Sequence, residues 1–327
     1  LYNVADTMVV GYALGDDALA AVGATTSIYA LIMMFLNGSA NGFSIVLAKY
    51  FGAQNYSKMR KVIANSILLS VVLTLVLTII SLIFCIPLLK LLNTPDKIIE
   101  SSYVYIQILF FCLIFTMMYN LSSGLLRAIG NSFMPLVFLV IAVILNIGLD
   151  MLFVYKFELG IAGAAWATVL AQLVSVILCF IYILKRCPMM HVKISDFKID
   201  KEIFMELIKM GFSVGMSLSI VQIGSVILQS AINGFGEAYI TAHTTSRRIS
   251  NIIMLPLGTM STAASTFASQ NLGAGKIDRI KEGMKSAIFI SWGWSAFVII
   301  MIYFFGESLT RFLTGTNDKT IIDSTVY

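Results

Sequence analysis

The segment FMPLVFLVIAVILNIGLDMLFVY fills residues 133–155 and carries one charged side chain, Asp150. It is long enough to cross the hydrocarbon core of a bilayer as a helix, which takes about 20 residues. An ionised group at membrane depth is costly, so it usually marks a substrate path, an ion site or a proton relay. A second carboxylate, Asp6, lies in the apolar run at residues 1–12. This pair of carboxylates predicts an ion-coupled function.

The composition extends this interpretation to the whole chain. Of the 327 residues, 58% are hydrophobic and 12% are charged, whereas soluble domains average about 25% charged residues. Backbone groups in hydrocarbon must satisfy their own hydrogen bonds, which favours helices, and the short alternating segments of a membrane β-barrel are missing. We predict an all-α polytopic membrane protein. Its complete helices are expected at 24–48, 62–89, 102–125, 133–155, 160–185, 206–233, 240–270 and 284–306, after a partial helix at 1–12.

Basic residues are distributed unevenly between the connections of these helices. Most of them lie in the alternate loops 49–62, 124–133, 185–209 and 271–285. By the positive-inside rule these loops face the cytoplasm, so the net charge of +5 reflects topology. We expect membrane lipids around the chain and no nucleic-acid partner, because a basic nucleic-acid site needs a folded soluble surface to display it.

Cysteine and histidine do not indicate metal or redox chemistry. The four cysteines are scattered without a CxxC pair, and neither His191 nor His243 has a second ligand at metal spacing. The sequence also lacks a Walker motif, a Ser-His-Asp order and an HExxH motif. We therefore predict a transporter without a cofactor rather than an enzyme. Its energy would come from an ion gradient.

The two halves of the chain resemble each other when one is shifted by 221 positions. The Phe-Gly-Ala turn at 51–53 then falls on Leu-Gly-Ala at 272–274, and Lys58 falls on Arg279. An even number of expected helices separates equivalent points, so both halves insert with the same orientation. Parallel repeats of this kind form transporters whose binding site lies between the halves.

The repeat predicts the domain organisation. We expect an N-terminal lobe at 1–186, a cytoplasmic linker at 187–203 and a C-terminal lobe at 204–327. The chain starts inside an apolar run without an initiator Met, and no secretion signal is recognisable. We expect it to be a fragment that begins within its first helix and lacks three helices of the second lobe.

Four polar residues of the first lobe are expected at a similar depth. Counting the helix rise from the outer ends of their helices places Asp6, Asp150 and Thr168 about 12–15 Å inside the membrane. Asn146 precedes Asp150 by one turn on the same helix face. Their oxygens suit Na⁺, and two neighbouring carboxylates can also share a proton. The alternative for Asn146 and Thr168 is hydrogen bonding between helices without an ion.

The second half lacks this pattern, because Ile227 stands where the first half has Asp6. Cation coupling is therefore expected in the first lobe alone. Arg247 and Arg248 come early in the helix expected at 240–270. They either extend toward the outer membrane surface or face a cavity and bind an anion.

The chain resembles the multidrug and toxic compound extrusion family of transporters. The resemblance rests on Val4–Thr7 with Leu19–Gly23, on Gly124–Asn131, on Asn146–Asp150, and on Thr241–His243 with Gln270–Gly273. It implies two six-helix lobes around a central cavity and export of organic, often cationic, compounds in exchange for Na⁺ or H⁺. The cation site of the DinF-like branch would correspond to Asp6, Asn146, Asp150 and Thr168. The acidic residue that the NorM-like branch carries near Gln222 is absent.

On this basis we hypothesise alternating-access export by a monomer in the cytoplasmic membrane of a bacterium. The candidate residues for the cavity that binds small organic substrates are Met33, Met34, Phe35, Phe43, Gln222, Arg247 and Arg248. Met and Phe at helical spacing also suit core packing or lipid contact.

Three other functions are alternatives. A flippase for lipid-linked precursors would need a basic cavity, for which Arg247 and Arg248 are the local indication. A receptor or scaffold would leave the carboxylate pair structural. An intramembrane aspartyl protease would need motifs such as GxGD, which the sequence lacks.

Overall fold

The computed structural model describes residues 9–91, 94–232 and 237–314, and within these ranges it contains helices and turns without a strand. Residues 9–14 are helical. The further α-helices are α2 (Asp16–Gly52), α3 (Tyr56–Leu91), α4 (Asp96–Phe111), α5 (Leu113–Ala128), α6 (Phe133–Asp150), α7 (Gly160–Arg186), α8 (Lys201–Ile232), α9 (Glu237–Gly273) and α10 (Ile277–Thr314). Within the described residues seven helices are long and apolar enough to span a membrane, or eight if α4 and α5 count as one. The predicted all-α polytopic fold is confirmed.

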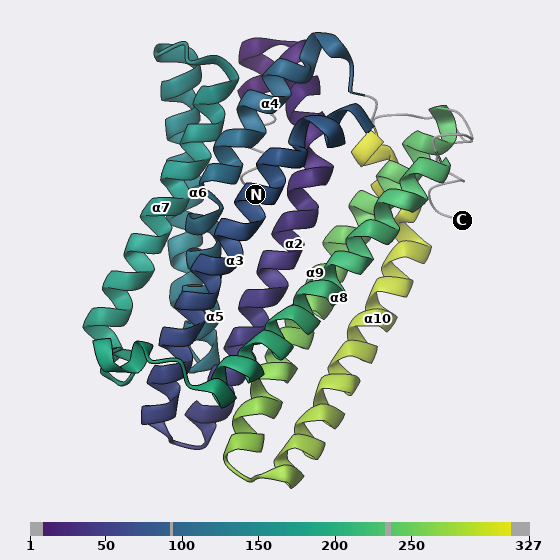
Figure 1. Ribbon diagram of the computed structural model, residues 1–327. Helices are drawn as coiled ribbons and strands as arrows, with labels where there is room; N and C mark the ends of the chain where they lie inside the picture. Colours follow the sequence, from purple (N-terminus) through teal and green to yellow (C-terminus); the bar gives the residue numbers. More distant parts are fainter. Residues whose placement is uncertain (1–8, 92–93, 233–236, 315–327) are drawn as a thin grey trace. The chain divides into compact units, whose positions relative to one another are not determined.

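The chain forms two compact units, residues 1–220 and 221–327, with the division inside α8. In the first unit the long helices α2, α3, α5, α6 and α7 run along one another (Figure 1). α3 also turns a row of exposed apolar side chains outward, at Val72, Leu75, Ile79 and Ile83. A helix that is apolar on its outer face as well as its inner face is typical of a membrane span.

The helix expected at 102–125 is broken. α4 and α5 meet at Cys112 with a bend of 46°. The amide N–H of Cys112 donates to the carbonyl of Leu109, a three-residue step, and its φ of −104° and ψ of 11° leave the helical region. Neither proline nor glycine occurs at this point. Both α4 and α5 pack against α7, on either side of the break.

α2 and α8 cross at two glycine pairs within the first unit. Gly38 and Gly42 of α2 face Gly215 and Gly211 of α8. A Cβ atom on Gly38 would lie 2.6 Å from the Cα of Gly215, and one on Gly42 would lie 2.7 Å from the Cα of Gly211. Both helices thus carry a GxxxG motif, which lets two backbones approach closely in a membrane protein. We call these four glycines the α2–α8 seam.

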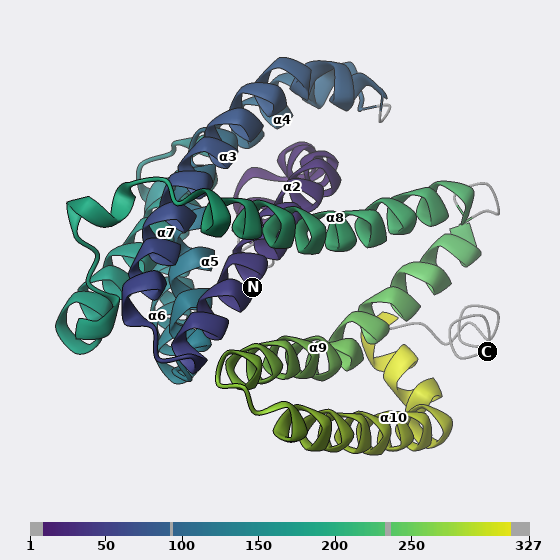
Figure 2. The same cartoon turned by 60° about the horizontal axis from the view of Figure 1, so that its bottom comes forward.

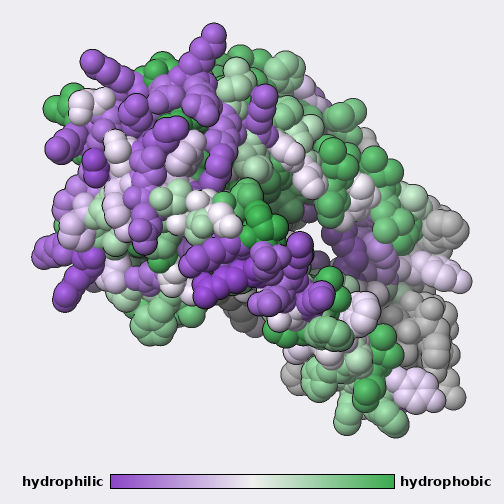
Figure 3. Space-filling view, turned by 90° about the horizontal axis from the view of Figure 1, so that it is seen from below, coloured by the Kyte–Doolittle hydropathy of each residue, from purple (hydrophilic) through white to green (hydrophobic). Residues whose placement is uncertain are grey.

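Ion pairs join α2 and α3 to the chain around the start of α8. The Nζ of Lys49 lies 2.6 Å from Glu206, and the hydroxyl of Tyr50 donates to the same carboxylate at 3.2 Å. Lys61 pairs with Asp200 at 3.0 Å. Figure 3, which looks onto this end, shows hydrophilic residues gathered there. The basic loop 49–62 is therefore tied to Asp200, within the predicted linker, and to Glu206, just after it.

The second unit contains α9 and α10, which run side by side and are joined by a short turn (Figures 1 and 2). α9 begins and ends 221 residues after α2, so the repeat seen in the sequence is also a repeat of helix boundaries. The indole Nε1 of Trp294 donates to the carbonyl of Ile253 at 3.0 Å, which links α10 to α9. Pro256 lies inside α9, where it removes a helix hydrogen bond near this link.

Candidate functional site

A buried polar group lies where α6 faces α7. α6 carries Asn146 and Asp150 one turn apart, and both side chains are 0% exposed. α7 presents Thr168, which is 2% exposed, and the Nδ2 of Asn146 donates to its Oγ1 at 3.3 Å. The structure thus places Asn146 beside Thr168, with Asp150 one turn away on the same helix. Asp6 lies outside the described residues.

The backbone changes form at the carboxylate. α6 ends at Asp150 and continues as a π-helix, η1 (Met151–Lys156). A π-helical turn inside an α-helix often marks a functional site, because it redirects side chains and leaves backbone groups less regularly paired. Gly163 of α7 packs against this turn, since a Cβ there would lie 3.2 Å from the Cβ of Phe153. The irregular turn is therefore held against the first turn of α7.

This arrangement offers a carboxylate, an amide oxygen and a hydroxyl in a site without water-exposed walls. Such oxygens are hard ligands, which suit Na⁺ better than a soft transition metal. A bound cation or proton would neutralise the charge of the Asp150 carboxylate, which is buried. Among the described residues no three His, Cys, Asp or Glu side chains come together as a multivalent metal site would require. A monovalent cation or a proton fits the donor set.

Two polar residues next to this group were not identified from the sequence. Gln172 follows Thr168 by one turn of α7, and Thr116 of α5 donates a hydrogen bond to its Oε1. Both are buried, with exposures of 7% and 5%. The spacing of Thr168 and Gln172 could have indicated Gln172, whereas its partner on α5 is 56 residues away in the chain.

Of the residues expected in the first-lobe part of the substrate cavity, two lie at the α2–α8 seam. Phe43 is 3% exposed and packs its ring against Gly211. Phe35 meets Phe212 edge to face, with ring centroids 6.1 Å apart. Both rings line a small cavity of about 110 Å³ between α2, α3 and α8.

Met33 is half-buried against the core, and Met34 is exposed. These two adjacent side chains therefore lie in different environments. The predicted contact of Met33 and Met34 with a substrate stays a prediction.

The residues expected in the second half lie in the second unit. Gln222 is half-buried on α8, and Arg248 is exposed on α9. A guanidinium nitrogen of Arg247 donates to the carbonyl of Ser225 at 3.4 Å. This bond holds Arg247 against α8, within the second unit. The substrate-binding roles of these residues stay predictions.

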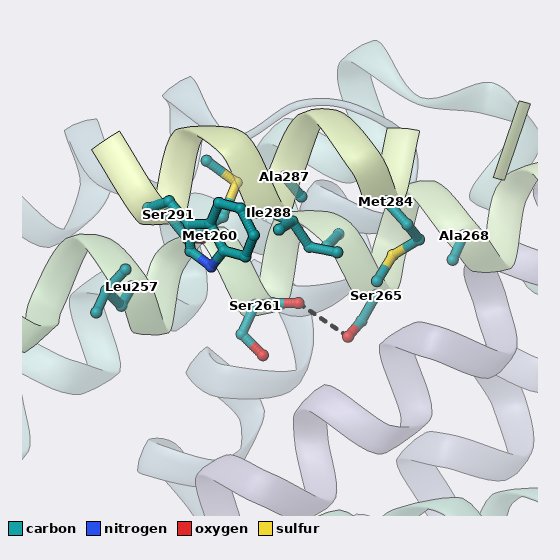
Figure 4. Close-up of a pocket in the computed structure, with 11 residues that line it drawn as sticks. Leu257, Met260, Ser261, Ser265, Ala268, Met284, Ala287, Ile288 and Ser291 are labelled. Atoms are coloured by element: carbon teal, nitrogen blue, oxygen red, sulfur yellow. Dashed lines mark hydrogen bonds between the residues drawn. The ribbon is translucent and has the colours of Figure 1, made fainter. Parts of the chain in front are cut away.

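A larger cavity, of about 470 Å³, lies between α9 and α10 (Figure 4). Its walls are mostly apolar, with Met260, Met284 and Ile288 beside Ser261 and Ser265. The hydroxyl of Ser265 donates to the carbonyl of Ser261 at 2.9 Å, so it is satisfied within its own helix.

The repeat gives this cavity a counterpart in the first unit. Ser44 is the equivalent of Ser265, and it is buried under Gly124 of α5 so closely that a Cβ on that glycine would collide with its hydroxyl. Leu36 and Leu47, the equivalents of Leu257 and Ala268, are also fully buried. The cavity therefore corresponds to a helix-packing surface, which makes it a weak candidate for substrate binding.

Comparisons with known proteins agree on one family. The family model MatE matches residues 1–152 and 214–326. The probable multidrug resistance protein YoeA of Bacillus subtilis is 30% identical, over 94% of this chain and 68% of its own length. The multidrug export protein MepA of Staphylococcus aureus is 23% identical, over 100% and 72%. A crystal structure of MATE in the bent conformation superposes with a TM-score of 0.91 at 25% identity, covering 99% of this chain and 73% of the other.

Proposed function

The chain belongs to the MatE family, and we propose that it exports organic compounds across a bacterial cytoplasmic membrane in exchange for a cation. As a member of this family it is a multi-pass membrane protein and a secondary transporter, not an enzyme. Its relatives include bacterial proteins named for multidrug resistance and multidrug export. Drugs or metabolites, often cationic, are the proposed substrates.

The observation that carries the coupling is the buried group of Asn146, Asp150 and Thr168 between α6 and α7. A carboxylate at membrane depth is retained where it serves transport, because a purely structural role does not require its charge. Either Na⁺ or a proton would neutralise Asp150, and the neighbouring amide and hydroxyl oxygens would complete the coordination or the hydrogen bonding. With Asp6 as the second carboxylate, we infer a site of the DinF-like arrangement.

Coupling requires the cation and the substrate to favour different conformations. A ligand that binds both states equally shifts neither. We propose that a compound binds when the transporter is open to the cytoplasm. A cation that reaches Asp150 from outside then favours the conformation that releases the compound.

Efflux of ethidium from cells that make the protein tests the proposal. We expect Asp6→Asn and Asp150→Asn each to abolish gradient-driven efflux, because a neutral amide cannot bind and release the coupling cation as a carboxylate does. Asp17→Asn is the matched control, since this carboxylate is 65% exposed and pairs with Lys97. Replacing Na⁺ by choline at constant pH distinguishes a sodium-coupled from a proton-coupled transporter. Intact efflux in both buried-site variants would reject cation coupling at this site.

A further inference from the structure

The polar group at Asp150 continues toward the linker end of α7. Thr168, Gln172 and Ser175 follow one another at spacings of four and three residues, which places them on one face of the helix. All three are buried. Gln172 lies about 6 Å below Thr168 along the helix axis. This face of α7 therefore offers side-chain oxygens beyond the group at Asn146 and Thr168.

α5 presents a matching face. The hydroxyl of Thr116 donates to the Oε1 of Gln172, and Asn120 follows Thr116 by one turn. The Nδ2 of Asn120 is buried, and within the described residues no hydrogen-bond acceptor reaches it. The same face continues through Ser123 to Arg127, whose guanidinium donates to Ser123 at 2.5 Å. Polar side chains thus extend from the middle of the first unit to the end of α5.

A buried polar group without a hydrogen bond is destabilising, and apolar residues would pack this interface without that penalty. Here that penalty applies to Asn120, which lies on the line of buried polar side chains that starts at the proposed cation site, so this line calls for a functional explanation. Neutral oxygens suit a monovalent cation in transit, because they replace part of its hydration without holding it as firmly as a carboxylate does.

We propose that Gln172 and Thr116 form an inner station for the coupling cation, occupied after it leaves Asp150. The oxygens of Thr116 and Gln172 bind Na⁺, or a water that carries the proton, on the way to the linker end of the bundle. The proposal rests on the function proposed above. It assigns cation release to the interior of the first unit, between α5 and α7.

Two transport assays in vesicles that contain the protein separate this role from simple helix packing. The first measures ethidium efflux driven by a cation gradient. The second measures exchange of ethidium across the membrane at equal cation concentrations, which needs no net cation release. We expect Thr116→Val and Gln172→Leu to slow gradient-driven efflux about tenfold, the lower end for the loss of a hydrogen bond to a charged group. Exchange should change less than twofold.

Tyr182→Phe is the matched control. Tyr182 accepts a hydrogen bond from Asn131 at 2.9 Å and lies on the same helix as Gln172, about 15 Å further along. Its loss removes one inter-residue hydrogen bond without touching the proposed station, so both assays should stay near wild type. Thr116→Ser keeps the hydroxyl and should restore gradient-driven efflux.

The outcomes distinguish this proposal from the proposed function. If Asp150→Asn retains gradient-driven efflux, cation coupling at the site itself is rejected. If Asp150→Asn loses it while Thr116→Val and Gln172→Leu match Tyr182→Phe, the inner station alone is rejected. A parallel loss of efflux and exchange in Thr116→Val, not restored in Thr116→Ser, would assign Thr116 to packing and also overturn the proposal.

Discussion

Replacing Gly38 with alanine should force α2 and α8 apart. The added Cβ would lie 2.6 Å from the Cα of Gly215 and 2.7 Å from the carbonyl oxygen of Val214. These are backbone atoms, so no side-chain rotation can relieve the contact. Carbon atoms in van der Waals contact are about 3.5–4.0 Å apart, so the two helices must separate by roughly 1 Å.

The magnitude follows from two opposing effects. Overpacking of a close helix contact costs about 1–3 kcal/mol. Alanine also favours the helix over glycine by about 1 kcal/mol at an interior position. Gly23→Ala in the same helix gains the helix propensity of alanine without overpacking, because a Cβ there would meet nothing within 4 Å. The free energies of unfolding of the two variants should therefore differ by about 1–3 kcal/mol.

Thermal unfolding of the purified protein in detergent measures this difference. A thiol-reactive fluorophore can report unfolding, because Cys85, Cys112 and Cys179 are buried in the first unit. We expect Gly38→Ala to unfold at a lower temperature than wild type and Gly23→Ala at the same or a higher temperature. Equal midpoints for the two variants would refute the close approach of α2 to α8.

Three further results are expected from residues around the start of α8. A double-mutant cycle on Lys49 and Glu206 should give a coupling free energy of at most about 1 kcal/mol, because their side chains are 38% and 27% exposed. A coupling free energy of several kcal/mol would contradict this expectation. The hydrogen bond from Lys61 lowers the pKa of Asp200, so the bond stabilises the fold above the unfolded-state pKa and is lost as pH falls through the folded-state value. The stability difference between wild type and Asp200→Asn should shrink in acid, and a difference that is independent of pH would count against the pairing. Burial raises the pKa of the Cys187 thiol, so a maleimide should label it slowly in the folded protein, and labelling at the rate of the denatured chain would exclude its buried position.

The helical spans could be predicted because hydrophobic length and a low charge content alone identify them. The repeat was also readable, since a shift of 221 residues maps the bounds of α2 onto those of α9. The break at Cys112 was not predictable, because no proline or glycine marks it. The packing of α4 and α5 against α7, on either side of the break, is not encoded by any local signal.

The polar interior was predictable along each helix and not between helices. Asn146 and Asp150 share a face by spacing alone, and the structure adds the hydrogen bond from Asn146 to Thr168. The hydrogen bond between Thr116 and Gln172 joins helices far apart in the chain. The spacing from Thr168 could indicate Gln172, but nothing in the sequence indicates its partner. Likewise, the two GxxxG motifs of the α2–α8 seam are visible in the sequence, although nothing there says that they face each other.

Cation flux driven by a substrate gradient measures most directly whether Asp150 couples cation movement to substrate movement. Vesicles containing the protein are given an ethidium gradient and equal Na⁺ and H⁺ on both sides, and cation flux is recorded. Wild type should move Na⁺ or protons in the direction opposite to ethidium, and Asp150→Asn should move neither while it still binds ethidium. Cation flux at the wild-type rate in Asp150→Asn would contradict the account.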